Sequence, residues 1–102
     1  MSAKPTVTFQ VAVMRDGVKE RQTITGERLT VQGFAGIRFV LHRSAPGWTH
    51  APRWTVSEAS TGRAVYNAHT KREAIEGART FLRYRGLGET QAAIAKILQE
   101  EP

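Results

Sequence analysis

The stretch that decides the fold is Trp54–Leu82, which reads WTVSEASTGRAVYNAHTKREAIEGARTFL. Its first part, Trp54–Glu58, has the alternating pattern and the aromatic and β-branched residues of a strand. A turn over Ala59–Gly62 and a returning strand over Arg63–Asn67 are predicted to follow. The remainder begins a helix after Thr70, so this stretch predicts a hairpin followed by a helix.

The predicted helix has both end signals. Thr70 is a favourable N-cap residue, and Glu73 three positions later completes a capping box. Gly86 is a natural residue for the helix end, and a second, shorter helix is expected over about Glu89–Gln99. The expected buried stripe consists of Ala74, Ile75, Ala78, Phe81 and Leu82. The charged side with Arg72, Arg79 and Arg83 is expected to be solvated.

Outward from this core stretch, the N-terminal part predicts a second hairpin. Thr6–Arg15 alternates apolar and polar residues, Asp16-Gly17 is a strong turn signal, and Val18–Thr25 is a more polar return strand expected at a sheet edge. Leu29–Val31 is a possible short strand, and Ile37–His42 is a clear one.

These elements predict an α+β fold: an antiparallel sheet of four to five strands with two hairpins, followed by one long and one short C-terminal helix. One domain is expected over 1–102, β-rich over 6–67 and helical over 70–100. The first helix covers one sheet face, and the opposite face is expected to be open to solvent or to a partner.

The charge of the chain is concentrated in its middle. The net charge is +6, and the segment 28–72 carries a single acid, Glu58. Its basic residues are Arg28, Arg38, Arg43, Arg53, Arg63, Lys71 and Arg72. We expect folding to gather them on one patch bordering the proline-containing loop Ser44–Arg53, which favours a polyanion or an acidic protein as partner.

Composition excludes several classes of protein. The chain has no cysteine, so it forms no disulfide and no Cys-ligated metal site. It has no apolar run long enough for a membrane span, and its first residues lack the apolar region of a signal peptide, so a cytoplasmic location is expected. His42, His50 and His69 lack metal-ligand spacing, and no nucleophile, paired carboxylates or phosphate-binding loop is recognisable. We therefore predict neither catalysis nor a cofactor.

The candidate nucleic-acid interface combines the sheet face away from the helix with the loop Ser44–Arg53, because basic groups interleaved with an aromatic suit phosphate contacts and base stacking. The alternative is that Trp48 packs under its own loop and that the arginines are solvated. The candidate residues are Arg38, His42, Arg43, Trp48, His50, Arg53, Thr55, Ser57 and Arg63.

The pattern W-T-V-S-E-A-S-T-G-R-A-V followed by T-K-R-E-A resembles the arm-binding N-terminal domains of phage integrases and small uncharacterised proteins of phages and mobile elements. The resemblance covers Trp54–Leu82. It implies a three-stranded sheet with one helix whose sheet face contacts DNA. Arg38, Thr55, Ser57 and Arg63 would then be the contacting residues. The chain differs in its extra N-terminal hairpin and in having no recombinase domain.

Two functional hypotheses follow. The first is a non-enzymatic nucleic-acid-binding accessory protein of a phage or mobile element, with DNA favoured over RNA. The alternative is a protein-binding module, either a phage-encoded inhibitor of a host defence complex (anti-CRISPR-like) that contacts an acidic host protein, or a protein that acts through a homodimer. The edge strand Val18–Thr25 would pair across such a homodimer.

Overall fold

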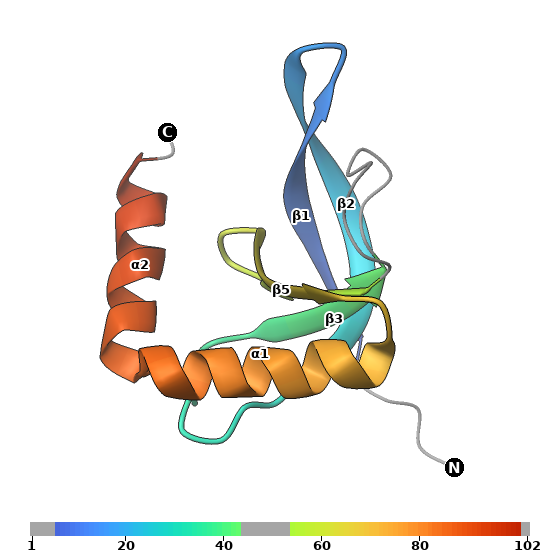
Figure 1. Ribbon diagram of the computed structural model, residues 1–102. Helices are drawn as coiled ribbons and strands as arrows, with labels where there is room; N and C mark the ends of the chain where they lie inside the picture. The colour runs from blue at the N-terminus through green and yellow to red at the C-terminus, as the bar shows by residue number, and fades with distance from the viewer. Residues whose placement is uncertain (1–5, 44–53, 101–102) are drawn as a thin grey trace.

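The computed structural model describes residues 6–43 and 54–100, which form an antiparallel sheet followed by two helices (Figure 1). The strands lie in chain order across the sheet, β1-β2-β3-β4-β5. The elements are β1 (Thr6–Arg15), β2 (Val18–Leu29), β3 (Phe39–Arg43), β4 (Trp54–Glu58), β5 (Arg63–Ala68), α1 (Lys71–Arg85) and α2 (Leu87–Glu100). The α+β fold predicted from the sequence is thus confirmed.

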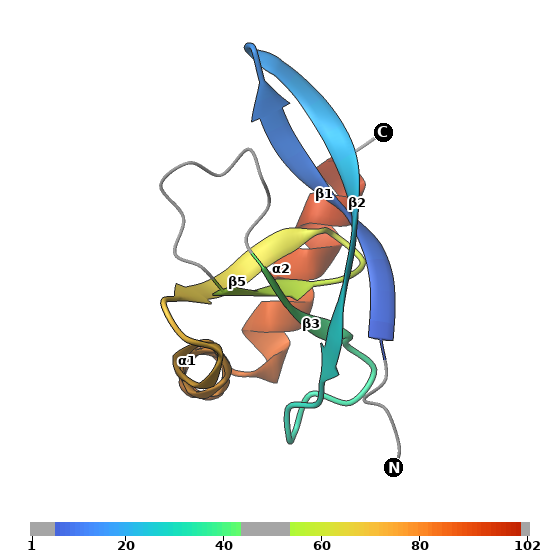
Figure 2. The same cartoon turned by 90° about the vertical axis from the view of Figure 1, so that its right-hand side faces the viewer.

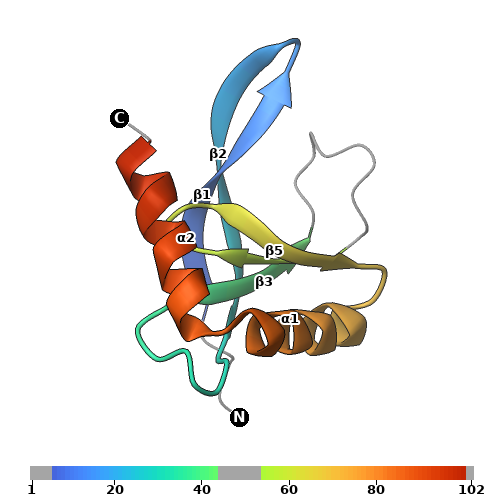
Figure 3. The same cartoon turned by 60° about the vertical axis from the view of Figure 1, so that its left-hand side comes forward.

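The first hairpin closes at the predicted turn. Asp16 and Gly17 both have positive φ, at 52° and 77°, as a two-residue type I′ turn requires. The return strand is longer than predicted, because β2 runs on to Leu29 and pairs with β3 over Glu27–Leu29. Its part Val18–Glu27 pairs with β1, so Glu27 has a partner on both sides, Thr6 and Leu41. The far half of this hairpin projects from the rest of the molecule (Figures 1 and 3).

Helix α1 begins and ends as predicted. The Thr70 hydroxyl accepts a hydrogen bond from the Glu73 N–H at 3.1 Å and donates one to the Glu73 carboxylate at 2.9 Å. Gly86 has φ 89° and donates its N–H to the Leu82 carbonyl at 2.8 Å. Helix α2 then turns away at a steep angle (Figure 3). Neither helix in the described ranges is long and apolar enough to cross a membrane.

The first core lies between α1 and one face of the sheet. Its buried residues are Leu29, Val31, Phe34, Phe39, Leu41, Val56, Ala68, Ala74, Ala78 and Leu82. Three residues of the predicted helix stripe are among them. Phe81 is not: its side chain is 38% exposed, so the prediction that it belongs to the buried stripe is wrong. It lies at the margin of the stripe, where it lines the spaces on the side of α1 that faces Tyr66 and α2.

The second core covers the other face of the sheet, and the prediction that this face is open is wrong. Phe9 and Val11 of β1 pack with Val40 of β3. In Figure 2, α1 is seen end-on to one side of β3 and β5, and the lower part of β1 and β2 lies to the other side. Strands of 10 and 12 residues are long enough for the normal strand twist to bring their apolar side over β3 and β4.

The turn between β4 and β5 closes this second layer. Gly62 lies so near the Gln10 carbonyl of β1 that a Cβ atom there would overlap it. The buried Glu58 carboxylate holds the turn, because it accepts the N–H groups of Ser60 at 2.8 Å and Thr61 at 2.9 Å. The acid that stands alone in the basic segment therefore has a structural role in the turn.

Candidate functional site

Three of the predicted nucleic-acid contacts lie inside the molecule. His42 is 2% exposed, and Thr55 and Ser57 are 0% exposed. Their alternation along β3 and β4 places them on the face away from α1, as predicted, but β1 and β2 cover that face. The expectation that they form an open DNA-contacting surface is therefore wrong. Thr55 instead donates a hydrogen bond to the Asn67 side chain on β5 at 2.7 Å.

His42 and Ser57 form a buried polar pair across β3 and β4. The imidazole Nδ1 lies 2.6 Å from the Arg43 carbonyl, which requires a proton on Nδ1, so Nε2 accepts the Ser57 hydroxyl at 2.7 Å. Burial lowers the pKa of His42, and the hydrogen bond to the Arg43 carbonyl opposes that shift. A hydroxyl bonded to an imidazole is also the arrangement of a serine nucleophile and its base. Here both groups are enclosed by the second core, so a substrate cannot reach them in this conformation.

The predicted cations do not gather on one patch. Arg38 precedes β3 and Arg43 ends it, which separates them by about 16 Å along the strand. The Arg43 guanidinium lies 4.5 Å from the centre of the Trp54 ring, and Lys71 pairs with Glu27 at 2.7 Å. Arg72 pairs with Glu76 at 3.2 Å, and the exposed Arg63 lies on β5 toward α2. Trp48, His50 and Arg53 lie outside the described residues, as does the predicted loop Ser44–Arg53.

The connection between β2 and β3 is built from two successive tight turns. Phe34 donates its N–H to the Val31 carbonyl at 3.1 Å, and Ile37 donates to the Phe34 carbonyl at 3.3 Å. Each turn has a glycine with positive φ at its third position, Gly33 at 87° and Gly36 at 89°, which is typical of type II turns. Phe34 is buried and meets the Phe39 ring edge-on. The loop is therefore anchored on the first core.

Arginines surround this loop. A groove of about 730 Å³ runs between the loop and α1 and includes Arg79 and Arg83 in its lining. Arg79 donates to the Thr30 carbonyl at 3.2 Å, which joins the helix to the loop. A smaller hollow of about 240 Å³, lined by the loop itself, includes Arg28, and Arg38 follows the loop. No carboxylate is among the described residues that line either space.

We call Arg28, Arg38, Arg79 and Arg83 the arginine surface. Arg79 and Arg83 lie on the α1 side of the loop, whereas strand alternation places Arg28 and Arg38 with Val40 on the other side of the sheet. All four side chains belong to exposed residues. The sequence places Arg28 and Arg38 in the basic segment, and it predicts that Arg79 and Arg83 lie on a solvated side of the helix. The signal that was available is the i,i+4 spacing of Arg79 and Arg83, which places both on one side of α1. That the β2–β3 loop lies beside them is visible only in the folded chain.

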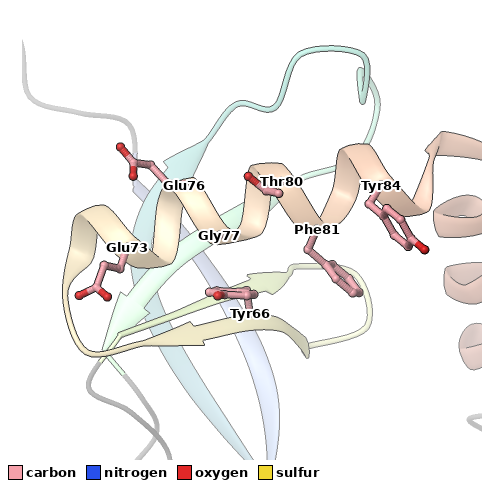
Figure 4. Close-up of a pocket in the computed structure, with 7 residues that line it drawn as sticks. All are labelled: Tyr66, Glu73, Glu76, Gly77, Thr80, Phe81 and Tyr84. Carbon is pink, nitrogen blue, oxygen red and sulfur yellow. The ribbon is translucent and has the colours of Figure 1, made fainter.

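A second groove lies on the opposite side of α1 and is lined by aromatic residues (Figure 4). Its volume is about 590 Å³, and we call it the aromatic groove. Tyr66 and Phe81 are each 38% exposed, and Tyr84 is 93% exposed. The lining consists of Tyr66, Glu73, Glu76, Gly77, Thr80, Phe81 and Tyr84.

Gly77 explains how Tyr66 comes to lie against the helix. Glycine in a helix interior costs about 1 kcal/mol relative to alanine. At this position a Cβ atom would overlap the Tyr66 ring, so the absent side chain makes room for it. In Figure 4 the ring lies alongside Gly77, with Phe81 and Tyr84 following along α1. The sequence signal for the groove was the spacing of Gly77, Phe81 and Tyr84, which recur every three to four residues.

Within the described ranges, no three histidine, aspartate or glutamate residues lie close enough together to hold a metal ion. Comparison of the chain with protein-family models, with curated proteins and with solved structures gives no match.

Proposed function

We propose that the protein is a nucleic-acid-binding accessory protein that binds DNA phosphates through the arginine surface. The observation that carries the proposal is the groove that Arg79 and Arg83 line, with Arg28 and Arg38 at the ends of the strands that the same loop joins. Among the described residues, no carboxylate lines the spaces beside this loop. Guanidinium groups suit phosphate oxygens because they present several donors in a planar fork. In this proposal the sugar–phosphate backbone lies in the groove between the loop and α1.

The arrangement on α1 fits the spacing of a nucleic-acid backbone. Arg79 and Arg83 are four residues apart, about 6 Å along the helix axis. Successive phosphates of one DNA strand advance about 3.4 Å along the duplex axis, so a helix parallel to that axis would place the two guanidinium groups at phosphates about two positions apart. The resemblance of Trp54–Leu82 to integrase arm-binding domains supports DNA over RNA as the ligand and a source in a phage or mobile element. We propose that binding takes place in the cytoplasm and without catalysis.

The proposed binding has little sequence preference. Of the four residues that would contact DNA in an integrase-like arrangement, Thr55 and Ser57 are 0% exposed, and Arg38 and Arg63 are exposed. Contacts to phosphates position a protein on a duplex but carry no direct sequence information. Affinity therefore comes from charge, and it falls steeply with salt because bound cations release counterions from DNA.

The experiment measures binding to short fluorescein-labelled duplexes of unrelated sequence by anisotropy, between about 50 and 200 mM salt. If all four arginines contact phosphates, the logarithm of the association constant falls with that of the salt concentration with a slope of about −3 to −4. Arg83→Gln reduces the size of this slope by about one, equally for all sequences. The matched control is Lys96→Gln on α2, which removes the same charge from an exposed residue away from the groove and leaves the slope unchanged.

Two results would overturn the proposal. One is the absence of binding at the lowest salt concentration. The other is an equal effect of Arg83→Gln and Lys96→Gln, which would mean that only net charge matters. The alternative function, a module that binds a protein, stays a prediction. The surface that supports it is the aromatic groove.

A further inference from the structure

The aromatic groove is separate from the arginine surface. Gly77 and Arg79 are two residues apart, which places them about 160° apart around α1, whereas Glu76 at the edge of the groove lies within about 20° of Arg83. The two surfaces also differ in charge, because the described residues that line the groove include the carboxylates of Glu73 and Glu76, of which Glu76 pairs with Arg72, and no cation. An inference about this groove therefore does not depend on the proposed DNA binding.

The groove continues toward α2. A neighbouring hollow of about 560 Å³ shares Phe81 and Tyr84 with it and adds Arg85 and Glu89. Between Glu73 and Tyr84 the helix advances about 16 Å, the length of about five residues of extended peptide. The combined surface thus has aromatic rings in its middle, Glu73 toward one end, and Glu89 together with Arg85 toward the other.

We propose that the aromatic groove binds an extended segment of a partner protein that carries lysine or arginine side chains on either side of an apolar or aromatic one. Aromatic residues are enriched in protein interfaces, and tyrosine is among the residues that contribute most binding energy there. Their ring faces attract cations, as the Arg85 guanidinium at 5.9 Å from the centre of the Phe81 ring illustrates within this chain. Glu73 and Glu89 add charge complementarity at the two ends.

The same groups disfavour other occupants. A nucleic-acid strand stacking on these rings would bring its phosphates toward the carboxylates of Glu73 and Glu89, whereas Glu76 is already paired with Arg72. A second copy of the chain is disfavoured because each copy carries a net charge of +6. A short basic segment avoids the first obstacle and carries fewer charges than a second copy.

The test uses the full chain and a display library of random seven-residue peptides. Peptides are selected on the unchanged protein and counter-selected on Tyr84→Ser, whose side chain is 93% exposed and whose replacement leaves the fold intact. We expect the enriched peptides to carry lysine or arginine flanking an aromatic or apolar residue. Tyr84→Ser then weakens binding of a labelled enriched peptide about tenfold, as loss of a central interface aromatic does.

Charge variants separate this site from DNA binding. Glu89→Gln weakens peptide binding and flattens its salt dependence, whereas Arg83→Gln, which lines neither hollow, leaves peptide binding unchanged. Conversely, Tyr84→Ser leaves duplex binding unchanged. Failure of one proposal is thereby distinguishable from failure of the other.

Four results would overturn the inference. The selection enriches no peptide over the Tyr84→Ser counter-selection, or the enriched peptides are acidic. Tyr84→Ser lowers duplex binding as much as Arg83→Gln does, which would assign base stacking to the groove. Finally, the protein forms dimers by sedimentation that Tyr84→Ser abolishes, which would make a second copy the occupant.

Discussion

His42 shows how the role that the sequence indicates for a residue can differ from its role in the folded chain. A histidine on the polar side of a strand suits contact with nucleic acid. In the folded chain it is an internal hydrogen-bonded group, with the Phe9 ring edge-on at 5.3 Å between ring centres. A buried polar group costs free energy unless its hydrogen bonds are made, and both ring nitrogens of His42 have a partner.

The burial of His42 predicts a dependence of stability on pH. Because burial lowers its pKa in the folded state below 6.5, the unfolded chain binds a proton more readily. The stabilisation is fully present above the unfolded pKa, and it is lost as the pH falls toward the folded one. We expect the free energy of unfolding to decrease from about pH 7.5 to 5.5, by at most about 1.4 kcal/mol per pH unit for one proton.

Urea unfolding of the protein and two variants at these pH values checks this prediction. His42→Gln removes the titrating group and flattens the pH dependence, even if it lowers stability throughout. His69→Gln, which replaces an exposed histidine, retains it. Equal pH dependence in all three proteins would show that His42 does not cause it.

At the scale of elements, the contact between the β4–β5 turn and β1 decides whether the second core closes. Gly62 has φ 70°, and a Cβ there would overlap the Gln10 carbonyl, which is backbone and cannot move aside. Gly17 at the tip of the first hairpin has a similar φ of 77° but no atom within contact distance of such a Cβ. A comparison of substitutions at the two glycines therefore separates the free-energy cost of backbone strain from the cost of a close contact.

We expect Gly17→Ala to lower the free energy of unfolding by roughly 1–2 kcal/mol, the cost of a left-handed backbone for alanine. Gly62→Ala carries this cost and in addition displaces the turn from β1, so its total reaches about 3 kcal/mol or more. Urea unfolding of both variants gives the comparison. Equal losses would mean that the turn does not pack tightly against β1.

At the scale of the whole molecule, β1 and β2 act as a layer that the remaining elements need. Without them Val40, His42, Thr55 and Ser57 would face water on a sheet of three short strands. We expect a chain truncated to begin at Glu27 to lose cooperative thermal unfolding and the dispersed amide signals of a folded protein. If the truncated chain folds and binds DNA with sequence preference, this prediction is wrong and the integrase-like arrangement is supported.

Much of the local structure could be predicted because it depends on neighbouring residues. Thr70 and Glu73 cap α1 through groups three residues apart, and Asp16-Gly17 adopts the conformation that its turn requires. The strand Trp54–Glu58 has the predicted bounds, and α2 has the predicted place. The candidate site could not be predicted equally well, because alternation assigns Thr55 and Ser57 to a face without showing what covers that face.

By itself, then, the sequence determined the order of strands, turns and helices and their assignment to an α+β fold, since these follow from short-range hydrogen bonding and hydrophobic periodicity. Only the tertiary structure decided which polar residues are buried and which cations line the same groove. The twist of the long first hairpin covers one sheet face. The packing of α1 beside the β2–β3 loop brings Arg83 to this loop together with Arg79, which is 49 residues along the chain from Thr30. Such long-range packing leaves no local pattern in the chain, which is why the surfaces differ from those that the sequence indicated.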